Sequence, residues 1–306
     1  MADQKIVPLV SIVVLNYNKH DDLVRNLSRL REIRYPELEV LVVDNCSTDG
    51  SREMVRTEFP EYQLIEAPFN GGVSIGRNLG FREARGEYVI YLDDDAVAPV
   101  DIVEKTVKIF QSDEKIGCLA YCVRQMPQDI LCNDLSRQWI INYHGAGHAF
   151  RTSVLKKIDY LDENFFYGGE EIDSTLRSLE KGYKTRFTPE IIIDHYARIR
   201  SGKEYGRRAS SWVASWCWFY MKHFPIYTAL LCVWRVWIDT AFQSLRRRSF
   251  DTPVVSLWKI FSGLPRILKL RQVASAETIA FYMDPSSEPS HYTKSITKKV
   301  LSKIFG

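Results

Sequence analysis

Three consecutive carboxylates, Asp93-Asp94-Asp95, directly follow an apolar run at residues 87–92. If this run is a β-strand, alternate residues point the same way, so Asp93 and Asp95 converge while Asp94 faces elsewhere. Two close carboxylates repel each other unless a cation lies between them, and hard cations such as Mg²⁺ and Mn²⁺ take oxygen ligands. The triplet predicts a divalent-metal site, although a solvated acidic turn would explain it equally well if it stood alone.

The apolar runs of the first hundred residues predict the elements that hold these carboxylates. Runs at residues 10–16, 38–43, 62–66 and 87–92 alternate with three helix-like segments, the last covering residues 73–84. This alternation predicts a parallel sheet with helices on both faces, as in half of a Rossmann-like domain.

In open α/β sheets a ligand binds beyond the carboxyl ends of the strands. The residues directly after the apolar runs are therefore the first candidates for a site, and they are polar. They are Asn16, Tyr17 and Asn18, then Asp44, Asn45, Cys46 and Ser47, and the three carboxylates at 93–95. We expect these groups to meet at one edge of the sheet.

A later segment is expected to form a helix from about Glu170 to a stop near Gly182. Its apolar stripe consists of Ile172, Leu176 and Leu179. Glu170 falls nearly opposite this stripe and Glu171 to its side, so Glu171 is better placed to line a cleft. A strand-like run at residues 185–195 then closes the domain.

Four motifs follow one another in the chain. They are DNCSTDGS from Asp44, NGGVSIGRNLGFREARGEYVIYLDDD from Asn70, YGGEEID from Tyr167, and His195 after the apolar run EIIID. In this order they resemble family 2 glycosyltransferases of GT-A fold, over roughly residues 9–200. The resemblance implies that a sugar passes from a nucleotide-diphosphate donor to an acceptor hydroxyl by a single, inverting displacement, without an enzyme–sugar intermediate.

The resemblance also implies roles on the donor side. Asp44 and Asn45 match the pair that contacts the base and ribose of the donor, with Asn45 where the family often has a second Asp. Arg77 matches the Arg of the family's ARN-G segment, here GRNLG, and is expected to face the donor. We assign Asn16 and Asp94 to the donor side as well.

For the metal, Asp93 and Asp95 resemble the DxD pair of the family, and His195 resembles the late His that completes the metal shell. The cofactor is expected to be Mn²⁺ or Mg²⁺. The leaving diphosphate gains negative charge as the sugar–oxygen bond breaks, and a divalent cation together with Arg77 would stabilise that charge.

Glu171 is the candidate general base for the acceptor hydroxyl. The family commonly has Glu-Asp here, with the second acid implicated as base, whereas this chain has Glu170-Glu171. Glu adds one methylene of reach at a similar intrinsic pKa, about 4.3 against 3.9. Glu170 and Asp173 are further acceptor-side candidates. Alternatively, these acids complement the positive end of a helix, at ~0.3–1 kcal/mol each, and both interpretations can hold together.

Charge and tryptophan content divide the chain near His195. The formal net charge of the 306 residues is +3, but residues 1–195 carry −9 and residues 196–306 carry +12 with six of the seven Trp. A basic segment predicts contact with an anionic surface, and the Trp content favours a membrane over nucleic acid.

Residues 201–306 are therefore expected to form a helical, membrane-associating region that also shapes the acceptor side. Their apolar runs are shorter than the ~20 residues that span a bilayer, and residues 254–270 mix apolar and basic residues as an interfacial helix does. Arg246-Arg247-Arg248 predicts lipid contact, with a solvated corner as the alternative. The first residues show no secretory-signal pattern. We expect a cytoplasmic, peripheral position at the inner face of the cytoplasmic membrane.

Two other features favour structural explanations. The six Cys show no CxxC pair and no zinc spacing, which predicts reduced thiols, and Cys118 and Cys122 are read as strand residues. His144 and His148 are four residues apart but flank glycines, which favours a strand or loop over a metal-binding helix face.

We therefore predict an α/β fold of GT-A type at residues 1–200, followed by the helical region. The acceptor is expected to be a glycan, lipid-linked or at a bacterial surface. An inactive nucleotide-sugar or glycan-binding protein is the alternative that intact Asp93, Asp95, Glu171 and His195 disfavour. A sugar nucleotidyltransferase would need a Gly-rich phosphate loop with Arg and Lys, which residues 9–20 lack.

Overall fold

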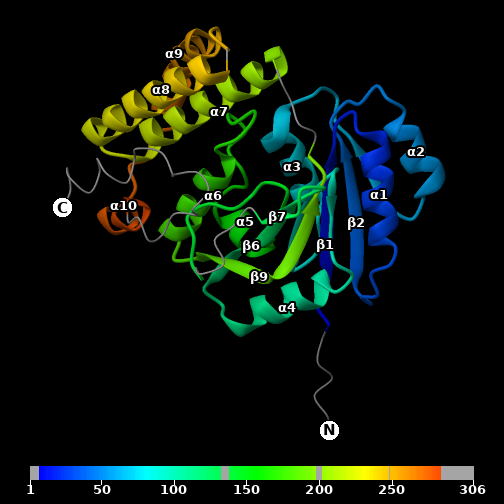
Figure 1. The fold of residues 1–306 in the computed structure, drawn as a ribbon. Coiled ribbons are helices and arrows are strands. Elements are labelled where there is room, and N and C mark those ends of the chain that lie inside the picture. Colours follow the sequence, from blue (N-terminus) through cyan, green and yellow to red (C-terminus); the bar gives the residue numbers. More distant parts are fainter. Residues whose placement is uncertain (1–6, 132–137, 198–201, 248, 284–306) are drawn as a thin grey trace.

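The structure, a computed structural model, describes residues 7–131, 138–197, 202–247 and 249–283. A mixed α/β unit at residues 7–197, called here the sheet domain, precedes four helices at residues 202–283, called here the helical region (Figure 1). The side chains of Arg246 and Arg247, and all of Arg248, lie outside the described residues, as does Cys132.

Four parallel strands form the first half of the sheet, in the order β3-β2-β1-β4. They are β1 (Val10–Asn16), β2 (Leu38–Asp44), β3 (Gln63–Glu66) and β4 (Tyr88–Asp93), connected by α1 (His20–Leu30), α2 (Ser51–Glu58) and α3 (Gly72–Glu83). The register places Asn16 opposite Asp44 and Leu15 opposite Asp93. The carboxyl ends of β1, β2 and β4 therefore lie side by side, as the apolar runs predicted.

The second half of the sheet is mixed. Its strands are β5 (Ala96–Val97), β6 (Ile116–Gln125), β7 (Ile130–Leu131), β8 (Gly147–Arg151) and β9 (Lys184–His195), with α4 (Ile102–Ser112), α5 (Thr152–Lys157) and α6 (Glu170–Glu180) around them. Strand β8 runs antiparallel between β4 and β6, and β9 runs parallel to β6. At the edge, β5 pairs antiparallel with β9 and sets Ala96 opposite His195. This pairing brings the end of β9 back to the end of β4.

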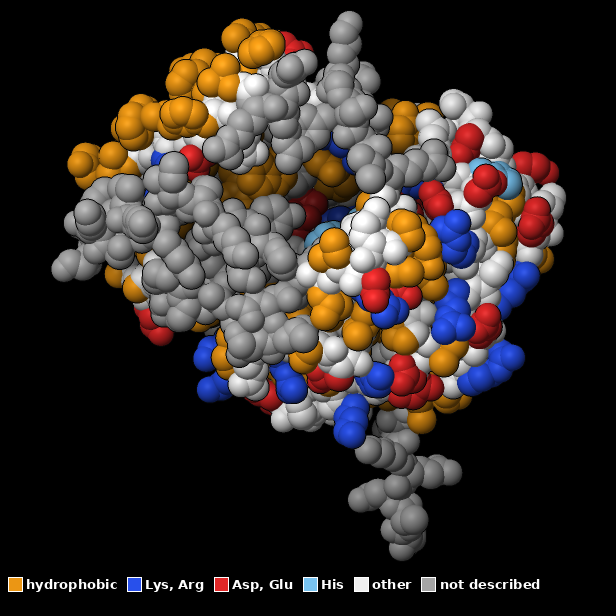
Figure 2. Space-filling model, in the orientation of Figure 1, with side chains coloured by type: hydrophobic (Ala, Val, Ile, Leu, Met, Phe, Trp, Pro, Cys, Tyr) orange, Lys and Arg blue, Asp and Glu red, His pale blue; other side chains and the backbone are white. Residues whose placement is uncertain are grey.

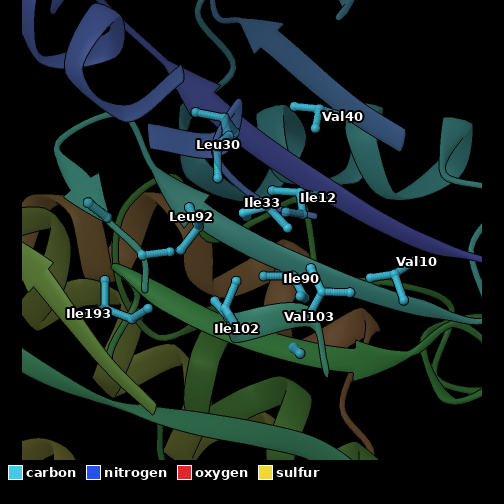
Figure 3. Packing of buried hydrophobic residues seen from close by; sticks show 14 of the residues in the cluster. Val10, Ile12, Leu30, Ile33, Val40, Ile90, Leu92, Ile102, Val103 and Ile193 are labelled. Carbon is cyan, nitrogen blue, oxygen red and sulfur yellow. The ribbon is translucent and has the colours of Figure 1, made fainter. Parts of the chain in front are cut away.

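Both faces of the sheet are buried. Along β1, Val10, Ile12 and Val14 pack on one face with α1, α2 and α4, and Figure 3 shows Val10 and Ile12 in this cluster. Val13 and Leu15 pack on the other face with α3. Side chains of a strand alternate between faces, so a run that is apolar at every position fits a strand covered on both sides. Cys118 and Cys122 lie buried in β6, as expected, and the described cysteines are free thiols.

The helical region consists of α7 (Gly202–His223), α8 (Ile226–Arg247), α9 (Thr252–Lys269) and α10 (Ala276–Met283). Pro225 separates α7 from α8, because Pro lacks the N–H that would continue the backbone hydrogen bonds of α7. Helix α7 packs on α6 through a buried cluster that includes Ile172, Leu176, Phe219 and Phe224. The sheet domain and the helical region therefore share a hydrophobic core.

The outer side of α8 and α9 is apolar and exposed. Its large side chains, called here the apolar face, are Ile226, Leu230 and Trp234 on α8 and Val254, Trp258 and Phe261 on α9. Figure 2 shows hydrophobic side chains gathered over this end of the molecule. None of the helices built from described residues combines the length and the hydropathy that crossing a bilayer would need.

Candidate active site

A cleft of about 940 Å³ opens at the carboxyl ends of β1, β2 and β4. Its lining comes from the loops after these strands, from the loop at residues 142–146, from the start of α6, and from α7 and α9. The sheet topology thus gathers polar side chains from distant parts of the sequence in one cavity.

Two carboxylates and an imidazole converge at the end of β4. Ligand atoms of Asp93, Asp95 and His195 all lie within 4.8 Å of one another, and His195 Nε2 is 3.2 Å from Asp95 Oδ1. Burial alone would lower the pKa of His195, but the hydrogen bond and the charge of Asp95 raise it above its ordinary value. Two oxygens and one nitrogen in this arrangement suit a Mn²⁺ or Mg²⁺ ion.

Lys19 is a cation beside these acids that sequence reasoning missed. Its Nζ forms ion pairs with Asp94, at 3.0 Å, and with Asp95. Burial alone would lower the pKa of Lys19, but the two carboxylates raise it. Burial also raises the pKa of Asp94 to about 7, whereas the hydrogen bond from His195 and the charge of Lys19 hold the pKa of Asp95 well below its usual range. Its position shortly after the first strand, where site residues were expected, was the one feature of the sequence that could have indicated it.

Asp94 is not one of the three residues of the metal-site group, although it shares Lys19 with Asp95. Its Oδ2 accepts a hydrogen bond from the backbone N–H of Tyr17 at 3.1 Å. Asp94 therefore fixes the loop that follows β1, while it also lines the cleft.

Asn16, Asp44 and Asn45 form the polar layer after β1 and β2. Asn16 Nδ2 donates to Asp44 Oδ2 at 3.0 Å, and both side chains are buried beneath the cleft lining. Asn45 lines the cleft and bonds through its side chain to Asn70 Oδ1 at 3.0 Å and to the N–H of Gly71 at 3.2 Å. These contacts support the wall of the cleft, and contact of the three residues with a donor stays a prediction.

Arg77 and Glu170 form a buried ion pair in the floor of the cleft. Arg77 Nη1 is 2.9 Å from Glu170 Oε1, its Nη2 is 3.7 Å from Asp93 Oδ1, and its guanidinium lies 4.3 Å above the ring of Tyr91. Glu170 is 1% exposed. Burial, and then the nearby charge of Glu171, raise the pKa of Glu170 well above its usual range. Glu170 is buried although it was expected nearly opposite the apolar stripe of α6, because the helix is covered on that side as well.

Glu171 lines the cleft and keeps partial access to solvent. Its Oε2 accepts a hydrogen bond from the N–H of Gly169 at 3.2 Å. Gly168 and Gly169 both have positive φ, 73° and 92°, so this turn favours glycine. A Cβ on Gly145 would lie 2.8 Å from Glu171 Oε1 and 3.0 Å from Arg77 Nη2. The absence of a side chain at Gly145 leaves both groups room to face the cavity.

Asp173 lies outside the cleft, which corrects its expected acceptor-side position. Its carboxylate is fully buried and is 2.7 Å from Arg177 Nε, 2.9 Å from Lys222 Nζ and 2.7 Å from His223 Nε2. Burial would raise the pKa of Asp173, but these partners hold it well below its usual range. Asp173 therefore joins α6 to α7.

The two histidines at 144 and 148 do not belong to the metal-site group of the described residues. His148 is buried in β8 with its ring 4.2 Å from that of Tyr143. His144 lines the cleft, its Nδ1 accepts the N–H of Ala146 at 3.1 Å, and burial lowers its pKa to about 3.

Helices α7 and α9 contribute cleft residues that no motif indicated, among them Arg208, Trp212, Trp216 and Lys259. The basic and Trp-rich composition predicted an acceptor-side role for the whole region. It could not single out these residues, because the inward-facing turns of α7 depend on its packing against α6.

Residues 11–129 match glycosyl transferase family 2. A putative teichuronic acid biosynthesis glycosyltransferase, TuaG of Bacillus subtilis, is 31% identical over 108 residues, which are 33% of this chain and 41% of that protein. The chain thus spans less than half the length of this relative. A Haemophilus influenzae glycosyltransferase is 28% identical over 220 residues, 68% of this chain and 79% of that protein.

Solved structures support the fold. The mannosyltransferase PcManGT from Pyrobaculum calidifontis, in complex with GDP-Man and Mn²⁺, superposes with a TM-score of 0.59 at 20% sequence identity, covering 91% of this chain and 79% of that chain. The α/β fold of GT-A type, with a helical C-terminal region, is therefore confirmed.

Proposed function

We propose that the chain is a member of glycosyl transferase family 2, which its residues 11–129 match, and that it transfers a sugar from a nucleotide-diphosphate donor to an acceptor hydroxyl, with inversion. One observation carries the proposal. The metal-site group of Asp93, Asp95 and His195 shares a single cleft with Arg77 and with the partly exposed carboxylate of Glu171.

Asp93, Asp95 and His195 would hold a divalent cation, Mn²⁺ or Mg²⁺, because their ligand atoms already converge within 4.8 Å. Such a cation supplies positive charge that stabilises the leaving diphosphate. Arg77 adds a fixed positive charge in the cleft floor, and its pairing with Glu170 keeps the guanidinium in place. A preorganised charge of this kind stabilises the transition state without reorganisation cost.

Glu171 would accept the proton of the acceptor hydroxyl. The hydrogen bond from Gly169 orients its carboxylate, and the lack of a side chain at Gly145 leaves room for Oε1. Glu170 cannot take this role as it stands, because it is buried and paired with Arg77. Asn45, in the cleft lining after β2, would contact the nucleoside part of the donor.

The acceptor is proposed to be a glycan at a membrane, lipid-linked or otherwise at a bacterial surface. The similar protein TuaG is a putative teichuronic acid biosynthesis glycosyltransferase, which supports a role in glycan assembly. The apolar face of α8 and α9, together with the net charge of +12 after His195, supports peripheral attachment to the anionic inner face of the cytoplasmic membrane.

A donor panel tests this proposal. UDP-, dTDP- and GDP-sugars are added to the full chain with Mn²⁺ or with EDTA, and both the unfolding temperature and the release of nucleoside diphosphate are measured. At 100 times its dissociation constant, a true donor adds about 2.7 kcal/mol of stability. We expect the sugars of one nucleotide class to stabilise the protein and to be hydrolysed slowly. Both effects should occur with Mn²⁺ and not with EDTA.

Glu83→Gln is the matched control, since Glu83 is an exposed carboxylate on α3. It should behave as the wild type, whereas Asp95→Asn should lose the response to Mn²⁺. Stabilisation without any turnover, even with glycan acceptors, would instead identify an inactive nucleotide-sugar-binding protein. No response to any nucleotide sugar would contradict the proposed function itself.

A further inference from the structure

One wall of the cleft comes from the helical region and lies outside the segment that matches the family, residues 11–129. Two indole rings of α7 line it, those of Trp212 and Trp216, with centroids 5.4 Å apart. Both side chains are half-buried, so part of each ring faces the cavity. Flat aromatic faces of this kind pack against the C–H faces of a ligand such as a pyranose ring.

Two cations accompany these rings. The guanidinium of Arg208 lies 4.9 Å above the ring of Tyr167, and its Nη1 donates to the Tyr167 hydroxyl at 3.3 Å. Neither contact neutralises the charge of Arg208. Lys259 of α9 reaches across to α7, where its Nζ donates to Ser210 Oγ at 3.0 Å and to Ser211 Oγ at 2.7 Å. Both cations line the same cavity, where partial burial strengthens their attraction for an anion.

This wall adjoins the proposed base. A Cβ on Gly168 would lie 2.5 Å from Cδ1 of Trp212, so the indole packs directly on the turn that precedes α6. The next residue, Gly169, donates its N–H to Glu171. A general base must touch the hydroxyl that it deprotonates. If Glu171 is the base, the part of the cleft beside this turn receives the acceptor.

We propose that the acceptor is a phosphorylated sugar, whose pyranose ring packs on Trp212 and Trp216 and whose phosphate is bound by Arg208 and Lys259. This inference rests on the proposed function and names its acceptor class. Arg binds phosphate through paired N–H groups and Lys binds it as a point charge, so the two cations together select a phosphate over a neutral substituent.

The phosphate could belong to a soluble sugar phosphate or to a sugar linked to a lipid through phosphate. The structure favours the lipid-linked source, because α9 carries Lys259 toward the cleft and Val254, Trp258 and Phe261 on its exposed side. A helix that lies on a membrane through this exposed side would hold its inward cation close to the lipid headgroups.

Binding of matched ligand pairs tests the inference. The full chain, saturated with Mn²⁺ and with UDP or GDP, whichever binds in the donor panel, is titrated with pyranose 1-phosphates of glucose, galactose and N-acetylglucosamine, and with the corresponding methyl glycosides. Tryptophan fluorescence reports binding. We expect at least one sugar phosphate to bind about tenfold or more tightly than its methyl glycoside, as charge-assisted hydrogen bonds predict.

The ratio of the two affinities is then measured in Arg208→Gln, in Lys259→Gln and in the double variant. It should fall toward one in the double variant, whereas Lys108→Gln, an exposed cation on α4, should keep the wild-type ratio. Arg208→Lys retains the charge and should keep part of the preference, which separates anion binding from a packing defect. Trp212→Leu should weaken both members of a pair.

An unchanged ratio in the double variant would overturn the inference. So would an equal loss of affinity for the nucleoside diphosphate, because the cations would then belong to the donor. If nucleotide sugars are hydrolysed but no sugar phosphate is preferred, only this inference fails; if no nucleotide sugar binds, the proposed function fails as well. A polyprenyl diphosphate sugar in anionic vesicles, compared with the soluble sugar phosphate, identifies the source: tighter binding of the former assigns the lipid-linked one.

Discussion

The sheet domain and the helical region differ in where they place their apolar side chains. The sheet domain buries continuous apolar strands between two layers of helices, and its polar side chains collect where the strands end. The helical region also exposes many apolar side chains: residues 226–273 hold thirteen of the twenty large hydrophobic side chains that are exposed among the described residues. An exposed apolar surface of this extent marks an interaction site. This difference fits the proposals that the sheet domain carries the reaction and that the helical region attaches it to a membrane.

The two regions meet at one shared cavity and one shared core. Glu171 begins α6 in the sheet domain, and α7 covers the other side of that helix. The comparison therefore makes separable predictions. Changes at strand ends should remove turnover, changes between α6 and α7 should remove stability, and changes on the apolar face should affect membrane binding.

The largest effect is expected for the metal-site acids. Asp93→Ala and Asp95→Ala should each lower turnover more than about 10³-fold, because the charge that stabilises the leaving diphosphate is lost. Donor binding should also become independent of Mn²⁺. Asp94→Ala should cause a smaller loss, since Asp94 bonds to the loop after β1 and not to the metal-site group. Steady-state kinetics and titrations with Mn²⁺ measure both effects. Three equal losses, or full activity in EDTA, would contradict the assignment.

A second effect is expected at Glu171. Glu171→Gln removes the proton acceptor but keeps the shape of the side chain, and should lower turnover about 10²–10⁴-fold at unchanged donor affinity. Glu170→Gln should mainly destabilise the protein, because it weakens the buried pair with Arg77. Turnover and the unfolding temperature separate the two. An active Glu171→Gln beside a stable but inactive Glu170→Gln would move the base one residue earlier.

The sequence predicted the sheet domain better than the helical region for a physical reason. Each strand end is fixed by local signals, so Asp93 and Asp95 could be placed from an apolar run and its register alone. His195 is brought to Asp95 by pairing of β5 with β9, about a hundred residues apart, and only the family motif indicated it. Lys19 was missed, because the ion pairs that single it out form only in the folded protein.

The errors on α6 have the same origin. A single helix read by its apolar stripe predicts one buried face, yet α6 is packed between the sheet domain and α7, so Glu170 and Asp173 are buried as well. Their partners, Arg77 on α3 and Lys222 and His223 on α7, are distant in sequence. Whether a second face of a helix is buried depends on tertiary packing, and the spacing of its apolar residues does not show it.

The third prediction therefore concerns Asp173. Asp173→Asn leaves Arg177 and His223 without their buried counter-charge, and leaves Lys222 with Asp162 alone. It should lower the free energy of unfolding by about 3–5 kcal/mol. The control is Glu53→Gln, which removes an exposed pair with Arg56 on α2 and should cost less than about 1 kcal/mol. Urea unfolding measures both. Equal, small changes would show that the sheet domain and the helical region are not joined through this cluster.

The pH dependence of stability follows from the same carboxylate. The pKa of Asp173 in the folded protein lies well below its ordinary value, so its contribution is full above the unfolded value of about 3.9 and is lost as the pH falls toward the folded value. Below about pH 4 the wild type should lose stability more steeply than Asp173→Asn. Unfolding curves between pH 3 and 6 test this, and parallel curves would contradict it.

The smallest effect is expected on the apolar face, where binding to membranes is shared among many side chains. Trp258 and Phe261 are 69% and 65% exposed on α9. Burying either side chain in a lipid interface should contribute on the order of 1.5–3 kcal/mol at most to the free energy of membrane binding. Trp258→Ser or Phe261→Ser should thus weaken vesicle binding about tenfold, on neutral and anionic lipids alike. Phe69→Ser, at an exposed aromatic of the sheet domain, is the matched control and should have no effect.

The electrostatic part of membrane binding should separate from this apolar part. Arg266 and Lys269 are exposed near the end of α9, and each cation close to an anionic surface adds about 1 kcal/mol that salt screens. Arg266→Gln with Lys269→Gln should therefore weaken binding to anionic vesicles at low salt and leave binding to neutral vesicles unchanged. Flotation of the full chain at low and high salt measures both parts. Salt screens the attraction of the charges, but it does not weaken the contribution of Trp and Phe side chains that are buried in the lipid. Equal flotation on neutral and anionic vesicles, or release only by detergent, would contradict peripheral attachment, because charge would then play no part in holding the helical region on the membrane.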